Sequence, residues 1–292
     1  MYRYAISVPD RVADDFAFLD VLSNAKLKRI EFSCSGSTSK EAMTDRIAIM
    51  AERQAAGKLE VGSVHIPFGG VWGISAPGEA VRSLAVANAR NFIRACAPLN
   101  CRNFTLHGSS EPIPTVPSER KKHLMAFRKS IEELLPTAKE FGISLNIEDL
   151  PRTCLANTIE EFGEMLDGFP MENIGVCFDV NHLCGCPERV PEALRVFAPR
   201  IRALHISDYD GVDETHWYPG LGILDWSAIM DAVRELPNDS VLIFESFGFL
   251  SVPQYQNRTI VPEVLLRSFE HCVFELENAA EIKRRINEQN IL

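Results

Sequence analysis

The sequence lacks both a long hydrophobic run and an excess of positive charge. No stretch approaches the ~20 apolar residues that a membrane-spanning helix needs. The opening segment MYRYAISVPDRV has neither the apolar core nor the cleavage site of a signal peptide. Acidic residues outnumber basic ones by 40 to 30, whereas general binding to nucleic-acid backbones requires clustered Lys and Arg. We therefore expect a soluble, cytoplasmic protein that binds neither membranes nor nucleic acids.

The cysteines lack the paired spacing of a zinc knuckle. The chain has eight of them, but a chain of this size does not depend on disulfides for its core. Several lie in or beside apolar segments, and we interpret these as small buried side chains in a reducing compartment. Cys184 and Cys186 form one C-x-C pair in HLCGCP with no second pair at the required spacing, so we assign that pair to a loop.

Eight short, mostly apolar segments recur along the chain, as expected for strands buried on both faces. None of them contains Pro or Lys, which often protect the edge strands of an open sheet. The predicted strands are Tyr4–Val8, Arg29–Ser33, Val61–Ile66, Asn103–His107, Ile143–Glu148, Ile174–Asp179, Ile201–Ile206 and Val241–Glu245.

The segments between these strands carry apolar residues at helical spacing. One helix is predicted near residues 118–142. Ser118 is its candidate N-cap, and Gly142 is its C-terminal stop. Pro136 inside it predicts a kink or a late break. Asn157 or Thr158 is expected to cap the helix that follows the fifth strand. The other helices are expected near residues 10–25, 40–57, 79–99, 157–168, 187–198, 226–236 and 261–289.

Strands that alternate with helices, without an internal linker, predict an α/β protein with one (β/α)8 TIM barrel over residues 1–292. The length and the hydrophobic fraction of 46% are typical of one such domain. A doubly wound open sheet is the alternative fold, but it would need edge strands.

Chemistry in such a barrel occurs at the C-terminal ends of the strands, where this chain places most of its histidines. Five of its seven histidines fall at strand ends or in the loops that follow, whereas His123 and His271 lie in predicted helices. The polar residues at or after the strand ends are Glu31, His65, His107, Glu148, Asp179, His182, His205, His216 and Glu245.

Several carboxylates that converge on one barrel mouth repel one another unless a positive charge lies among them. No Lys or Arg occupies a predicted C-terminal strand end, so a divalent cation is the simplest source of that charge. Glu148, Asp179, His205 and Glu245 come from four consecutive strands and predict a metal site with three carboxylates and one imidazole. This donor set suits one divalent ion, either Mn²⁺, Mg²⁺ or Co²⁺, and is compatible with Zn²⁺.

The acidic stretch Ala203–Trp226 contains one of these ligands and a loop. His205 ends the seventh strand, and His216 lies beside a Pro-Gly-x-Gly turn that leads back over the site. Asp208 is expected either to lie on the substrate side of the site or to cap the loop, and Asp225 to begin the next helix.

The motifs LNIEDLPR, VCFDVNH, ALHISD, THWYPGLG and LIFES, in this order and at these strand positions, resemble the xylose isomerase-like TIM barrel superfamily. The resemblance is to its sugar (phosphate) isomerase/epimerase branch and covers nearly the whole chain. It implies a metal-dependent isomerase or epimerase that acts on a ketose or a related polyol or keto-sugar. Proton transfer would proceed through a metal-stabilised enediolate.

Carried over by position, the resemblance selects the same four metal ligands. It makes Glu148 and Glu245 the two acid/base glutamates that exchange a proton with a substrate carbon. His182 corresponds to a substrate-contacting histidine, and Arg152 completes a Glu-x-x-x-Arg spacing that is similar to the epimerases. We expect five residues to bind the carbohydrate substrate, namely His65, His107, Arg152, His182 and His216.

The sequence departs from the 3-epimerases in the loop after the seventh strand. That loop, DYDGVDETH, has no counterpart of their substrate-binding arginine, so recognition must differ. The scarcity of basic residues at the strand ends also argues against a phosphorylated substrate.

Two other functions stay open. A cousin of the family, the zinc-dependent abasic-site nuclease of the endonuclease IV type, has a three-zinc pattern whose positions this chain matches. Against that function stand the net charge of −10, the Glu-x-x-x-Arg spacing and loops without evident wedge-inserting residues. A catalytically silent, metal-binding barrel is the third reading. The positions that match the three-zinc pattern of the nuclease are His65, His107, Glu148, Asp179, His182, His205, Glu214, His216 and Glu245.

The final helical stretch, EVLLRSFEHCVFELENAAEIKRRI, has an apolar face long enough to pack on the barrel or to contact a second subunit. The sequence therefore allows either a monomer or a homo-oligomer.

Overall fold

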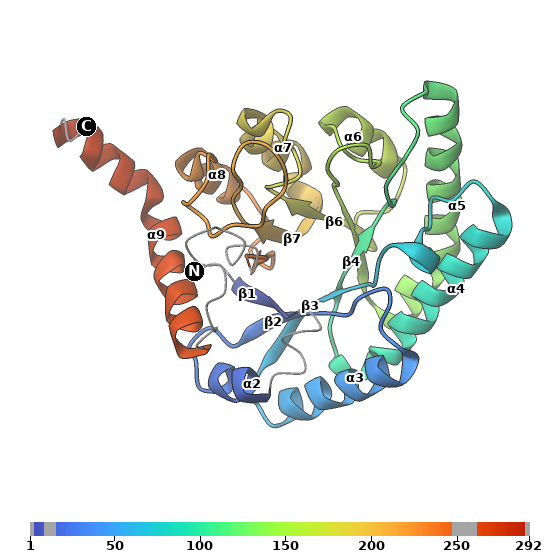
Figure 1. Cartoon of the computed structure of the whole chain (residues 1–292), viewed down its shortest axis with the longest axis horizontal. Helices are drawn as coiled ribbons and strands as arrows, with labels where there is room; N and C mark the ends of the chain where they lie inside the picture. Colours follow the sequence, from blue (N-terminus) through green and yellow to red (C-terminus); the bar gives the residue numbers. More distant parts are fainter. Residues whose placement is uncertain (1–2, 9–15, 247–261, 290–292) are drawn as a thin grey trace.

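Eight parallel strands form a closed barrel in which each strand pairs with its sequence neighbours and β8 pairs with β1 (Figure 1). The computed structural model describes residues 3–8, 16–246 and 262–289. The closed sheet confirms the predicted (β/α)8 barrel and excludes the open sheet. The strands are β1 (Arg3–Val8), β2 (Arg29–Ser33), β3 (Glu60–His65), β4 (Asn103–His107), β5 (Ser144–Glu148), β6 (Ile174–Asp179), β7 (Ile201–Ile206) and β8 (Val241–Phe244).

The strand boundaries agree with the prediction to within one residue at each end. Every residue of β5 and β6 is buried, because helices cover the outer face of the barrel and side chains fill its inside. Strand β8 ends at Phe244, so Glu245 lies directly after the strand rather than at its last position.

Side chains inside the barrel form layers beneath the strand ends. Residues two apart on a strand share a face, so Asp179 stands above Cys177 on β6 and His205 above Ala203 on β7. The apolar floor below them is a small buried cluster, separate from the larger core between strands and helices. Its members are Ala5, Cys177, Ala203, Val241 and Ile243.

The helices surround the barrel at the predicted places (Figure 1). Expected helical residues 10–15 and 261 lie outside the described part of the chain. The helices are α2 (Phe16–Ser23), α3 (Lys40–Ala55), α4 (Glu79–Ala95), α5 (Pro117–Phe141), α6 (Ile159–Leu166), α7 (Val190–Phe197), α8 (Trp226–Val233) and α9 (Pro262–Gln289).

The prediction for the ends of α5 is half right. Gly142 ends the helix in the left-handed region at φ 60°, as expected. The N-cap prediction is wrong, because the helix begins at Pro117 and its N-cap residue is Val116. Proline suits the first helical position, since its φ is already helical and it has no N–H group to satisfy there. The helix also continues through Pro136 to Phe141, so Pro136 does not end it.

Two other helix starts agree with the sequence. The Thr158 hydroxyl accepts a hydrogen bond from the Glu161 N–H at the start of α6. The Asp225 carboxylate accepts one from the Ala228 N–H at the start of α8. In both cases the side chain satisfies a backbone donor that the helix cannot pair itself.

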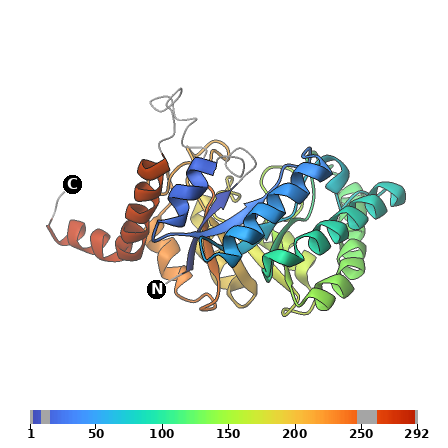
Figure 2. The same ribbon diagram turned by 90° about the horizontal axis from the view of Figure 1, so that it is seen from below.

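Helix α9 packs against α2 and α8 on one side of the barrel. Figures 1 and 2 show its C-terminal part extending away from the barrel. Within the described residues, no helix is both long enough and apolar enough to cross a membrane. No disulfide joins any of the eight cysteines, all of which lie in the described part of the chain, and Cys184 and Cys186 lie in the loop after β6, as predicted.

Candidate metal centre and active site

The predicted polar residues gather at the C-terminal ends of strands β3 to β8. Glu148, Asp179 and His205 are buried at the ends of β5, β6 and β7, and the register pairs Asp179 with His205 across neighbouring strands. Parallel strands in a barrel place their C-terminal ends around one opening. The geometry therefore brings residues that are far apart in the sequence to one centre.

The four predicted metal ligands surround one point. The candidate ligand atoms of Glu148, Asp179, His205 and Glu245 all lie within 4.8 Å of one another. The Nδ1 atom of His205 lies 3.1 Å from Glu148 Oε1 and 3.0 Å from Glu245 Oε2. It lies 3.9 Å from Asp179 Oδ2. Three carboxylates and one imidazole thus face a common centre, as required for a divalent metal site with mainly oxygen ligands.

Asp179 has an oxygen that suits a cation. Its Oδ1 atom accepts the backbone N–H of Asn181 at 2.7 Å, but Oδ2 is buried without a hydrogen-bond donor. A buried carboxylate oxygen that lacks a donor is costly unless it meets a positive charge. This orphaned oxygen faces the same centre as His205 Nδ1, so the residues present fit a bound divalent cation.

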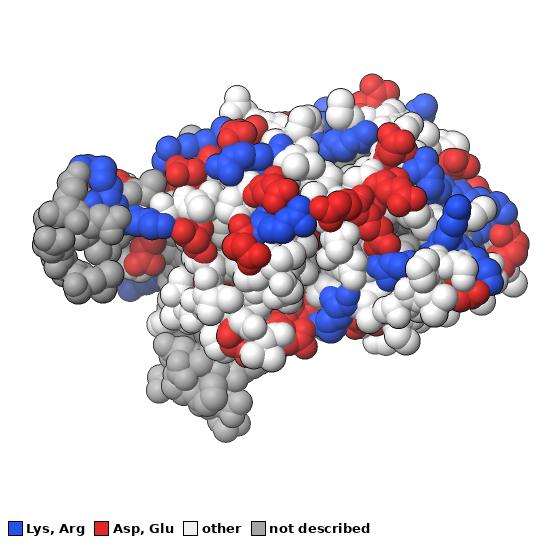
Figure 3. Space-filling view, turned by 90° about the horizontal axis from the view of Figure 1, so that it is seen from above, with Lys and Arg blue, Asp and Glu red and all other residues white. Residues whose placement is uncertain are grey.

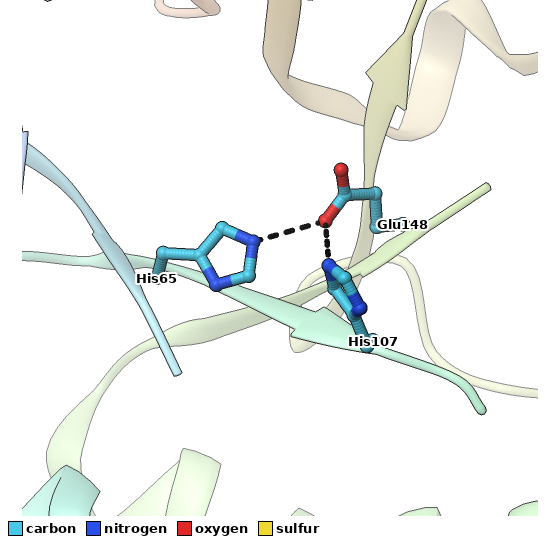
Figure 4. A group of neighbouring side chains, drawn as sticks. All are labelled: His65, His107 and Glu148. Carbon is cyan, nitrogen blue, oxygen red and sulfur yellow. Dashed lines mark hydrogen bonds and ion pairs between the residues drawn. The ribbon is translucent and has the colours of Figure 1, made fainter. Parts of the chain in front are cut away.

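A second group lies beside the first and shares Glu148. The Nε2 atoms of His65 and His107 point at the same carboxylate oxygen, Glu148 Oε2, at 3.1 and 3.0 Å (Figure 4). The exposed ring of Phe68 stacks on the His107 imidazole, with 4.1 Å between the ring centroids. Residue spacing could not predict this aromatic contact, because Phe68 belongs to an irregular loop. Glu148 is therefore placed to bridge two groups of potential ligands.

A third group contains Asp179, His182 and His216. His182 Nε2 lies 3.0 Å from Glu214 Oε2 and 3.5 Å from Asp179 Oδ2. An antiparallel bridge between Asp208 and Trp217 folds the loop after β7 back over the site. His216 thereby comes within 4.0 Å of Glu245 Oε2. The predicted histidines are all at the centre, and Glu214 joins them.

Two of these histidines have their outer nitrogen committed to a backbone carbonyl. His65 Nδ1 lies 2.9 Å from the carbonyl oxygen of Ile66, and His182 Nδ1 lies 2.7 Å from that of Asp149. A carbonyl only accepts hydrogen bonds, so Nδ1 must carry the hydrogen in both rings. In each ring Nε2 is then the nitrogen that faces the carboxylates, and metal-ligating histidines are held in the same way by a partner of their other nitrogen.

The electrostatics of the centre follow from this crowding. Burial by itself would lower the pKa of His65, but the hydrogen bond to Glu148 and nearby carboxylates raise it to about 9. Burial likewise opposes the shift at His182, yet Asp179 and Glu214 raise the pKa of His182 well above its ordinary value. Burial would raise the pKa of Glu148, whereas His107 and His205 hold it well below its usual range. Negative charge at the centre thus attracts protons or other cations.

Arg152 lies at the mouth of the site but is held by three carboxylates. Its guanidinium donates to Glu111 at 2.8 Å and to Asp213 and Glu214 at 2.9 Å each. Its backbone has a left-handed φ of 53°. Arg152 therefore ties together the loops after β4, β5 and β7. The sequence predicted a substrate contact for Arg152, and in this structure its guanidinium contacts protein carboxylates.

Asp208 organises the loop after β7. Its buried carboxylate accepts backbone N–H groups from Tyr209, Gly220 and Leu224, and the indole N–H of Trp226 at 2.9 Å. Of the two roles expected for Asp208, the geometry agrees with loop capping.

The family model of xylose isomerase-like TIM barrels matches residues 19–263 of the chain. The chain belongs to this family. A curated relative, an uncharacterized protein of Methanocaldococcus jannaschii, is 26% identical over 63% of each chain. The inosose isomerase of Bacillus velezensis is 25% identical over 50% of this chain and 55% of its own length. The matches thus span little more than half to just under two thirds of these relatives.

Solved structures share the fold over nearly the whole chain. A D-tagatose 3-epimerase-like protein superposes with a TM-score of 0.75 and 20% identity, covering 96% of this chain and 99% of that one. The IolI protein, crystallised with a bound zinc atom, gives a TM-score of 0.75 and 17% identity, covering 95% and 99%. At this identity the likeness establishes the barrel fold, and the chemistry must be argued from the residues at the strand ends.

Proposed function

We propose that this protein is a divalent-metal-dependent sugar isomerase or epimerase that acts on a ketose or a related polyol or keto-sugar. The observation that carries the proposal is the convergence of Glu148, Asp179, His205 and Glu245 on one point at the barrel mouth. The names of the relatives, which include inosose isomerase and D-psicose 3-epimerase, support the same class of reaction.

The four ligands would hold one Mn²⁺, Mg²⁺, Co²⁺ or Zn²⁺ ion. When bound, such an ion polarises a substrate carbonyl and makes the adjacent C–H group more acidic. Ligation also keeps the carboxylates of Glu148 and Glu245 ionised and oriented for proton transfer.

The two glutamates have different access to a substrate. The side chain of Glu245 is 32% exposed, whereas that of Glu148 is 2% exposed. Both lie close to His205 Nδ1, at 3.1 Å for Glu148 and 3.0 Å for Glu245, so a sugar held at this centre would meet both carboxylates. We assign removal and return of the proton to Glu245 and Glu148, with Glu245 as the residue that a substrate reaches first. We assign the binding of substrate hydroxyl groups to His65, His107, His182 and His216.

The charge distribution supports an uncharged sugar. Arg152, four residues after β5, is already engaged by Glu111, Asp213 and Glu214. A phosphate group would have to displace these carboxylates and would meet further acids at the centre. Hydroxyl groups, in contrast, can donate to carboxylates and accept from histidines. We therefore infer a neutral ketose or polyol rather than a sugar phosphate.

One observation favours a second candidate, a zinc-dependent abasic-site nuclease. Three groups of potential ligands lie side by side at the mouth, and Glu148 and Asp179 each belong to two of them. The net charge of −10 argues against this function. A DNA-binding surface would need a continuous basic area. The face drawn in Figure 3 instead shows acidic and basic side chains interspersed.

One purified preparation can distinguish these functions. Metal content is measured by elemental analysis, exchange of ketose protons with D₂O by NMR, and nicking on a duplex with one abasic site. Bound metal together with exchange supports the proposal. Several zinc ions per chain with nicking and without exchange would replace it by the nuclease. A protein without bound metal that stays inactive after metal is added would be a silent barrel.

A further inference from the structure

A buried carboxylate that belongs to none of the three ligand groups contacts His205 at the candidate metal centre. Glu31, on β2, has no exposed surface. Burial of a carboxylate is expensive, typically several kcal/mol, unless hydrogen bonds or charges compensate it. The contacts of Glu31 therefore indicate what it does.

Both oxygens of Glu31 accept hydrogen bonds from inside the barrel. Oε2 accepts the Ser63 hydroxyl at 2.7 Å and the Thr105 hydroxyl at 3.4 Å. Oε1 lies 3.0 Å from His205 Nε2. The hydroxyls of β3 and β4 thus fix the carboxylate from one side, and its other oxygen reaches across the barrel to β7. Glu31 is sealed from the mouth, so it contacts the imidazole and not a substrate.

The two nitrogens of His205 face different partners. Nδ1 points to the candidate metal position, with Glu148 Oε1 at 3.1 Å and Glu245 Oε2 at 3.0 Å. Nε2 points the opposite way, to Glu31. Both nitrogens thus face carboxylates, but only the carboxylates beside Nδ1 belong to the candidate ligand group. A bound metal would therefore replace the hydrogen on Nδ1, whereas the Nε2 hydrogen stays donated to Glu31. The lone pair that could bind a metal is then on Nδ1.

We propose that Glu31 is a positioning residue that holds His205 in the Nε2–H form and thereby makes Nδ1 the metal-binding atom. The negative charge of Glu31 also increases the electron density of the ring and so strengthens Nδ1 as a ligand, as carboxylates behind metal-binding histidines generally do. This inference rests on the metal site of the proposed function.

The first test compares the Zn²⁺ affinity of the wild type with that of Glu31→Gln, measured by competition with a chromogenic chelator. The substitution keeps the shape and removes the charge. Losing an outer partner of this kind weakens metal binding by about 10- to 100-fold, and we expect a decrease in this range. The matched control is Glu60→Gln, which removes an exposed carboxylate at the opposite end of the barrel, where it pairs with Arg29. That control is expected to bind Zn²⁺ like the wild type.

Circular dichroism and thermal melts of the chelator-treated proteins distinguish a metal-site effect from misfolding. Equal Zn²⁺ affinity in folded Glu31→Gln and the wild type would overturn the role of Glu31 and leave the metal site intact. A wild type that binds no Zn²⁺ would instead overturn the metal site itself, and the role of Glu31 with it.

A second measurement needs no variant, so it decides the question even if Glu31→Gln fails to fold. The Zn²⁺-loaded wild type is labelled with ¹⁵N-histidine, and the His205 resonances are identified by their loss in His205→Gln. We expect the proton on Nε2 and the metal on Nδ1. A proton on Nδ1, or zinc on Nε2, would overturn the proposal.

Discussion

Replacing Glu245 by glutamine should remove turnover while the protein stays folded. Glu245 Oε2 lies 3.0 Å from His205 Nδ1, and the Glu245 side chain is 32% exposed. Loss of a charge-assisted contact of this kind lowers the free energy of unfolding by about 1.5–3 kcal/mol. Because Glu245 is partly exposed, we expect the lower value. For a chain of 292 residues, about 1.5 kcal/mol lowers the melting temperature by roughly 2–3 °C.

The effect on catalysis should be much larger. General acid/base catalysis by a positioned side chain is worth about 10²- to 10⁴-fold in rate, which corresponds to about 3–5 kcal/mol of activation free energy. The assay is the conversion of a ketose, followed by NMR at saturating metal so that weaker ligation does not mimic a lost base. Glu235→Gln is the matched control. Glu235 lies just after α8, is exposed and pairs with Arg195 on α7. A wild-type rate in Glu245→Gln would refute the assignment of Glu245 as an acid/base residue.

Three further predictions concern the metal and the loops. A divalent metal at about 100 times its Kd should stabilise the protein by about 2.7 kcal/mol, which is roughly 4–5 °C in melting temperature for a chain of this length. An unchanged melting curve would contradict the site. Although burial opposes it, Cys177 and nearby carboxylates raise the pKa of His205 well above its ordinary value. A bound metal must therefore displace a proton from His205, so the metal affinity should fall as the pH falls. Calorimetry in two buffers should show about one proton released per metal at neutral pH. Binding without proton release would contradict this prediction. Arg152→Gln should change stability by only about 1 kcal/mol, because its ion pairs are partly exposed, but it should raise KM for the ketose as the loops after β4, β5 and β7 lose their connection. An unchanged KM would show that this connection does not shape the substrate site.

The strand-end residues could be predicted because, in a barrel of parallel strands, all C-terminal strand ends surround the same opening. Apolar segments of five or six residues identify the strands, and the rule that chemistry occurs at their C-terminal ends selects the polar residues that follow. The structure brings Glu148, Asp179 and His205 together although they are separated by up to 57 residues, since closure of the sheet does not depend on loop details. Glu245 was found as well, even though β8 ends one residue before it.

The remaining features depend on information that spacing does not carry. Glu31 lies within an apolar strand, and its partner His205 is 174 residues away, so only the packing of the barrel interior relates the two. The contacts of Arg152 depend on three irregular loops and on a left-handed backbone that a residue other than glycine rarely adopts. The Ser118 cap was wrong because Pro117, one residue earlier, starts the helix by itself.

The most direct test of the central claim is metal-dependent exchange of a ketose proton with D₂O. The purified protein is divided into a sample loaded with Mn²⁺, a sample treated with chelator, and a chelator-treated sample to which Mn²⁺ is restored. Each is incubated with a panel of neutral ketoses and followed by proton NMR at the carbon next to the carbonyl. We predict that the signal of one ketose decays in the first and third samples and persists in the second. Exchange that is equally fast after chelation, or absent from all three samples, would contradict a metal-dependent isomerase or epimerase.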